Sequence, residues 1–95
     1  MIIYVAGKMK GLPNKGRELF DEAETRLTVM GHVVLNPSKL PDGLHVNSYM
    51  SICTRLIDAA DAIYLLKNWV NSEGAKLEKQ YAEYQNKLII MEVEK

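Results

Sequence analysis

The chain has 95 residues and a formal net charge of zero at pH 7, and 47% of its residues are hydrophobic. This length predicts a single domain over residues 1–95, and the neutral charge gives no indication of binding to polymeric nucleic acid or to a membrane. Cys53 is the one cysteine, which excludes an internal disulfide and favours a reducing compartment, the cytoplasm.

The first part of the chain predicts two strands with a helix between them. Residues 1–6 form a continuous apolar run that ends at Gly7, which is typical of a strand covered on both faces. A loop rich in turn residues follows, and Asn14 is the expected cap of a helix whose apolar residues recur at spacings of three and four until Gly31. Residues 33–35 predict the second strand.

The rest of the chain predicts two more helix–strand pairs. Asn47 or Ser48 can cap the second helix, and residues 62–66 form a third buried strand. A third helix is expected over residues 73–86, followed by a strand at 88–91. This alternation predicts a three-layer α/β domain of the flavodoxin or Rossmann type, with a four-stranded parallel sheet and helices on both faces.

In such sheets, ligands bind beyond the carboxyl ends of the strands, where the strand order reverses. We therefore expect three segments to meet at one crevice: residues 7–11, Asn36 and residues 68–78. Glycines let a backbone approach a ligand closely, and two lysines of the first loop are suited to a phosphate. A solvated turn with surface lysines explains the same residues equally well. The predicted ligand-binding residues of this loop are Gly7, Lys8, Met9, Lys10 and Gly11.

Glu78 is the most informative candidate for chemistry. Ala75 and Ala82 are its neighbours at i−3 and i+4, so this helix face carries little bulk and the carboxylate could touch a ligand. A surface glutamate paired with a neighbouring lysine is the alternative interpretation, and composition alone favours it. Tyr4 lies in a buried strand, where its hydroxyl needs a partner, so it is either a core residue or reaches the crevice.

Segments spread along essentially the whole chain resemble a family of small bacterial and phage proteins known as a domain of unknown function, DUF4406. The segments are residues 3–13, 35–37, 40–44, 49–50, 61–66, 69 and 72–78. That family is similar to the nucleoside 2-deoxyribosyltransferase superfamily, of which it looks like a short member. The superfamily includes a deoxynucleoside 5′-monophosphate N-glycosidase.

The resemblance implies roles for individual residues. The nucleophilic glutamate of the superfamily falls on Glu78, in a segment that begins at Gly74, and a strand tyrosine near the sugar falls on Tyr4. A serine of the glycosidase branch falls on Ser72, and the glycine-rich loop that approaches base and phosphate falls on residues 7–11. The implied reaction is a double displacement at C1′ of a 2-deoxyribosyl group, resolved by a second base or by water, without a cofactor.

Two departures from the family pattern affect the predicted function. Both the enzymes and typical family members carry an aspartate at the position that lies eight residues before Asp61 in this chain. Here that position is Cys53, and a thiol is a poor proton donor or sugar ligand. Lys8 and Lys10 replace uncharged residues, which suggests a ligand more anionic than a free nucleoside. Two functions are therefore favoured: an enzyme that cleaves or exchanges the N-glycosidic bond of a 2′-deoxynucleoside or its 5′-monophosphate, and a weakened module that senses or sequesters nucleotides. A structural or interaction protein with a vestigial pocket is a third alternative, which no surface pattern specifically supports.

Further expectations concern metals and partners. His32 and His45 show no metal-ligand spacing with Cys53, so no metal site is predicted. Because so small a core leaves a thin margin of stability, we expect a homodimer or larger homo-oligomer. Tyr81 and Tyr84 on the third helix are the expected dimer face, together with the second helix.

Overall fold

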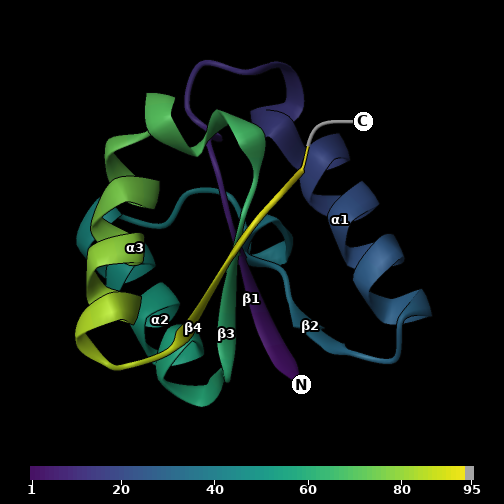
Figure 1. Ribbon diagram of the computed structural model, residues 1–95. Coiled ribbons are helices and arrows are strands. Elements are labelled where there is room, and N and C mark those ends of the chain that lie inside the picture. The colour runs from purple at the N-terminus through teal and green to yellow at the C-terminus, as the bar shows by residue number, and fades with distance from the viewer. Residues whose placement is uncertain (94–95) are drawn as a thin grey trace.

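The computed structural model describes residues 1–93, in which strands and helices alternate along the chain (Figure 1). The strands are β1 (Ile2–Ala6), β2 (Val33–Leu35), β3 (Ala62–Leu65) and β4 (Leu88–Met91). They form one sheet in the order β2-β1-β3-β4, and each neighbouring pair is parallel. The α-helices are α1 (Arg17–Val29), α2 (Val46–Ala59) and α3 (Glu73–Tyr84). The predicted α/β class and parallel sheet are confirmed.

The sheet separates two helical layers, with α1 on one side and α2 and α3 on the other (Figure 1). Successive side chains of a strand point to opposite faces, and both faces of β1 and β3 are covered. The strand side chains that pack toward α2 and α3 are Tyr4, Ala6, Ile63 and Leu65. Those that pack toward α1 are Ile3, Val5, Ala62 and Tyr64. Tyr4 is thereby directed toward the layer that contains α3.

The start of α1 differs from the sequence-based expectation. Asn14 does not cap the helix, because Asn14 and Lys15 adopt left-handed backbone angles, with φ of 51° and 57°. The helix begins at Arg17, after Gly16 at φ 70°. A Cβ atom at Gly16 would also lie 2.9 Å from the Lys8 carbonyl oxygen, so this left-handed turn requires glycine.

The start of α2 also differs, whereas the start of α3 agrees. The ring Nδ1 of His45 accepts a hydrogen bond from the backbone N–H of Asn47 at 3.2 Å. Asn47 and Ser48 therefore lie in the first turn of α2 instead of capping it. Helix α3 begins at Glu73, as predicted, and Ser72 caps it, since Ser72 Oγ accepts a hydrogen bond from the backbone N–H of Ala75 at 3.1 Å.

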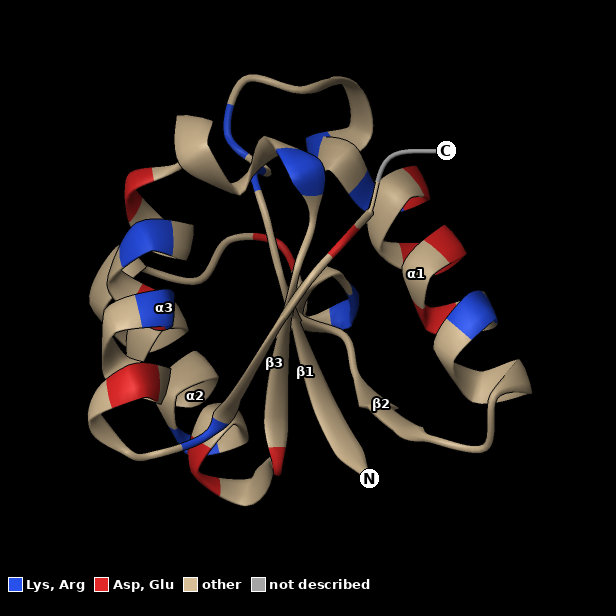
Figure 2. Ribbon diagram, in the orientation of Figure 1, with Lys and Arg blue, Asp and Glu red and all other residues tan. Residues whose placement is uncertain are grey.

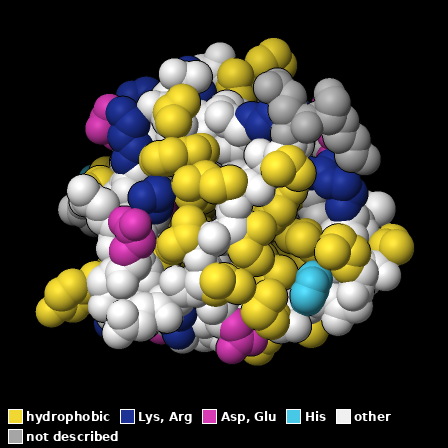
Figure 3. Space-filling view, viewed as in Figure 1, with side chains coloured by type: hydrophobic (Ala, Val, Ile, Leu, Met, Phe, Trp, Pro, Cys, Tyr) yellow, Lys and Arg dark blue, Asp and Glu magenta, His cyan; other side chains and the backbone are white. Residues whose placement is uncertain are grey.

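One apolar surface remains open beside α1. A groove of about 750 Å³ runs between α1 and the strands β3 and β4, and hydrophobic side chains gather on the face drawn in Figure 3.

On the other side of the sheet, Tyr81 donates a hydrogen bond to Asp58 at 2.5 Å, and Tyr84 is 85% exposed. A homodimer through that face stays a prediction. Within residues 1–93, no helix has the length and apolar character needed to span a bilayer.

Candidate active site

The loops that follow β1 and β3 meet at the carboxyl edge of the sheet. The backbone N–H of Lys8 donates to Asn68 Oδ1 at 2.8 Å, which joins the two loops directly. A Cβ atom at Gly7 would lie 2.7 Å from Leu66 Cδ1, so a glycine at this position lets the two loops pack closely together. Because β1 and β3 are neighbours whose connections run in opposite directions, this is the reversal point at which ligands bind in such sheets.

A carboxylate is buried beside this edge. Glu78 on α3 is 6% exposed, and its Oε2 accepts a hydrogen bond of 2.6 Å from the Tyr4 hydroxyl. The nearby lysines of α3 pair elsewhere, Lys76 with Glu73 and Lys79 with Glu83. The alternative of a surface glutamate paired with a lysine is therefore wrong.

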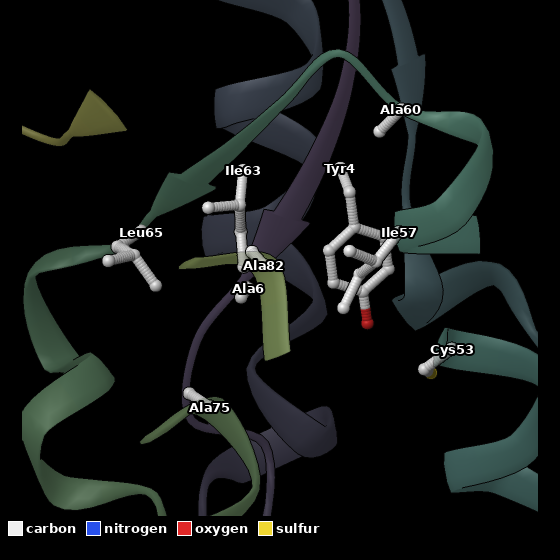
Figure 4. Close-up of a cluster of buried hydrophobic side chains, with 9 residues drawn as sticks. All are labelled: Tyr4, Ala6, Cys53, Ile57, Ala60, Ile63, Leu65, Ala75 and Ala82. Atoms are coloured by element: carbon white, nitrogen blue, oxygen red, sulfur yellow. The ribbon is translucent and has the colours of Figure 1, made fainter. Parts of the chain in front are cut away.

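Cys53 completes a buried cluster with Tyr4 and Glu78. Neither Tyr4 nor Cys53 has exposed surface, and Figure 4 shows the Tyr4 hydroxyl on the side of its ring toward Cys53. Burial raises the pKa of the Cys53 thiol to about 11, and burial likewise raises the pKa of Tyr4 well above its ordinary value. Both groups are therefore neutral near pH 7, and the Tyr4 hydroxyl donates its proton to the carboxylate.

The ionisation of Glu78 is set by two opposing effects. Burial raises the pKa of its carboxyl to about 7, because a charge is poorly solvated in the protein interior. Hydrogen bonds from Tyr4 and Cys53 lower the pKa, but by less than burial raises it. With a pKa close to neutrality, the carboxyl exists in both its protonated and its ionised form near pH 7. Strongly shifted carboxyls at the ligand edge of a fold are candidates for catalysis.

Tyr49 is a site residue that the sequence does not single out, because its position also fits the apolar stripe of α2. Its hydroxyl donates to Met9 Sδ at 3.0 Å, and its pKa is raised by burial and also by Cys53 and Glu78. The signal available in the sequence was its spacing of four residues from Cys53, which places both on one helix face.

A cavity of about 390 Å³ lies between the β1–α1 and β2–α2 connections. Its lining includes Met9, Lys10 and Gly11 from the predicted ligand loop, together with Tyr49. Tyr49 thus belongs both to the cavity wall and to the surroundings of the buried carboxylate, and it links the two. The larger groove beside α1 contains none of the three predicted catalytic residues.

The other predicted ligand residues serve local structure. The Asn36 amide donates to two acidic side chains of α1 and accepts from the turn that follows it, so all its hydrogen-bonding groups are engaged. Ser72 caps α3, and Gly74 lies half-buried in its first turn. Their contacts with a ligand stay predictions. Among residues 1–93, no three His, Cys, Asp or Glu side chains gather as possible metal ligands.

Comparison with known proteins agrees with this architecture. The family model described as "Domain of unknown function (DUF4406)" matches residues 1–91. The chain belongs to this family, and the predicted membership of DUF4406 is thereby confirmed. No curated protein matches the sequence significantly.

Among solved structures, the DUF4406 chain is similar to a 2-desoxiribosyltransferase from Leishmania mexicana, with a TM-score of 0.77 and 20% sequence identity. The match covers 95% of this chain and 62% of that protein, so the chain spans less than two thirds of its length. The predicted likeness to the nucleoside 2-deoxyribosyltransferase superfamily is confirmed at the level of the fold.

Proposed function

We propose that this protein cleaves or exchanges the N-glycosidic bond of a 2′-deoxynucleoside or its 5′-monophosphate, with Glu78 as the nucleophile. The observation that carries the proposal is a carboxylate that is 6% exposed, held by Tyr4 at 2.6 Å and located beside the ligand edge of the sheet. The fold shared with a 2-desoxiribosyltransferase supports the same class of reaction.

The chemistry follows from the position of the carboxylate. Tyr4 fixes Glu78 through Oε2, so the carboxylate is oriented before it attacks C1′ of the sugar. The new carboxylate–C1′ bond forms as the C1′–N bond breaks, and the bonding electrons leave with the base, which takes up a proton. A second base or a water molecule then releases the sugar from the enzyme. Because Glu78 is 6% exposed, a substrate reaches it only when the side chains around it move.

In the part of the chain that the structure describes, the site lacks an effective donor of the proton that the departing base takes up. Cys53 stands where the resemblance places an aspartate, and burial raises its pKa to about 11. General acid assistance is typically worth about 10²–10⁴ in rate. This observation favours a second candidate function, a nucleotide-binding module with weak catalysis.

The test is chromatography of deoxynucleosides and their 5′-monophosphates after incubation with the wild type, Glu78→Gln and Cys53→Asp. Glu73→Gln is the matched control, because Glu73 is an exposed glutamate of the same helix. Base release by the wild type and by Glu73→Gln, but not by Glu78→Gln, is the expected result. Release by Cys53→Asp alone would support the binding module, and release that survives in Glu78→Gln would remove Glu78 from the mechanism.

A further inference from the structure

The cavity beside Tyr49 carries an excess of positive charge. The charged residues in its lining are Lys10, Lys15, Arg17 and Asp42. Three cations thus face one carboxylate in a chain whose formal net charge is zero. Figure 2 shows Lys and Arg segments in the β1–α1 connection, at the carboxyl edge of the sheet. The rest of the lining is largely apolar, so the cavity combines an anion-binding end with an apolar wall.

Asp42 binds two of these cations through a single oxygen. Lys15 Nζ and Arg17 Nη2 lie 2.7 Å and 2.6 Å from the same atom, Asp42 Oδ1. The Asp42 side chain is 64% exposed, and exposed ion pairs contribute little to stability. Hydrogen bonds from Lys15 and Arg17 hold the pKa of Asp42 below its ordinary value, so this carboxylate is an anion at neutral pH. The contact is therefore ionic, and its exposure to solvent leaves it open to competition from another anion.

The guanidinium of Arg17 is held in place independently of Asp42. Its Nε donates to the Ser38 carbonyl at 3.0 Å, and its Nη1 donates to Asn14 Oδ1 at 3.2 Å. The left-handed turn that contains Asn14 presents this acceptor to the start of α1. A guanidinium fixed in this way is suited to phosphate, whose oxygens accept parallel N–H bonds.

We propose that this cavity binds the phosphate group of a small phosphate monoester, and that Asp42 occupies the position of that phosphate and is displaced by it. A phosphate dianion offers separate oxygens to Lys15 and Arg17, which now share one carboxylate oxygen. The apolar part of the ligand lies toward Met9 and Tyr49. The identity of this ligand with the substrate of Glu78 rests on the proposed function, whereas the binding does not.

This site differs from the phosphate contacts expected from the sequence. Lys8 does not line the cavity, and its backbone is bound to Asn68 at the junction of the two loops. Lys10 does line it. The proposed phosphate site therefore contains Lys15 and Arg17 together with Lys10, and it does not contain Lys8.

The proposal is tested by calorimetric titration of the Glu78→Gln protein, in which the nucleophile is absent. The probes are the four common 2′-deoxynucleoside 5′-monophosphates, the corresponding nucleosides, and inorganic phosphate. At least one monophosphate is expected to bind more tightly than its nucleoside. Lys15→Ala and Arg17→Ala should each weaken the binding of that monophosphate about tenfold, as expected for the loss of a charged hydrogen bond, and leave the binding of the nucleoside unchanged. Asp42→Asn should strengthen the binding of the monophosphate several-fold, because the carboxylate that competes with the phosphate loses its charge.

Lys39→Ala is the matched control, since Lys39 is an exposed lysine of the neighbouring turn that pairs with Glu24 and does not line the cavity. Equal losses of monophosphate affinity in Lys39→Ala and Lys15→Ala would overturn the proposal. Unchanged or weaker binding of the monophosphate by Asp42→Asn would overturn it as well. Equal affinities for nucleoside and monophosphate would overturn it too, even if inorganic phosphate binds. Base release by the wild type is measured separately, so the failure of either proposal is distinguishable from that of the other.

Discussion

Replacing Glu78 by glutamine tests whether burial of this carboxyl costs the protein stability. Glutamine has the shape of a protonated glutamate and can accept the Tyr4 hydrogen bond through its carbonyl oxygen, but it does not ionise. The variant should therefore match the wild type at low pH and exceed its free energy of unfolding at high pH.

The magnitude follows from the pKa of Glu78, which burial raises from an ordinary 4.5 to about 7. The folded protein binds this proton more tightly than the unfolded chain. The resulting stabilisation is fully present below pH 4.5 and is lost as the pH rises through about 7. A difference of about 2.5 pH units, at 1.36 kcal/mol for each unit, corresponds to about 3 kcal/mol.

The assay is urea unfolding of both proteins between pH 4 and pH 8. The free energy of unfolding of Glu78→Gln, minus that of the wild type, should increase by about 3 kcal/mol across this range. Other carboxyls titrate equally in both proteins and cancel from the difference. Glu73→Gln, on the exposed face of α3, serves as the control and should show a far smaller change. A difference that stays flat with pH for Glu78→Gln would refute the raised pKa.

Three other substitutions have defined outcomes. Tyr4→Phe removes a hydrogen bond that lowers the pKa of Glu78, so the midpoint of the same pH dependence should move above about 7; an unmoved midpoint would show that the bond is unimportant. Cys53→Asp should increase base release by about 10²–10⁴, measured by chromatography, and no increase would mean that position 53 supplies no proton. Gly7→Ala should lower the free energy of unfolding by about 1–3 kcal/mol in urea, because its Cβ would lie 2.7 Å from Leu66 Cδ1; full stability would show that the loop relaxes at little cost.

The strands were predictable because each is a short apolar run bounded by turn residues. Residues 33–35 and 88–91 were located to the residue, and the buried central strands followed from their continuous apolar character. The helix starts were less predictable. Asn14 has the side chain of a good cap, but the approach of Gly16 to the Lys8 carbonyl selects a left-handed turn instead. This contact joins residues on either side of the loop, so local preference does not reveal it.

The buried carboxylate was partly predictable, because Ala75 and Ala82 leave room on the face of α3 that carries Glu78. The spacing of Tyr49 from Cys53 places both residues on one face of α2, but the hydroxyl partner of Tyr49, Met9, lies in a loop 40 residues earlier and could not be predicted from the helix. The cationic cavity escaped the sequence interpretation for a similar reason. Its charges come from two connections that only the folded sheet brings together.

The hydrogen bond between Tyr4 and Glu78 also provides a spectroscopic probe. The Tyr4 side chain is 0% exposed, so its hydroxyl proton exchanges with water only when the structure opens locally. With an O···O separation of 2.6 Å, this proton should give a resolved, strongly downfield signal in a one-dimensional NMR spectrum. Its chemical shift should change as Glu78 ionises, because a bond to a carboxylate is shorter and stronger than one to a carboxylic acid. One peak would thus report the protonation state of the site without any substrate.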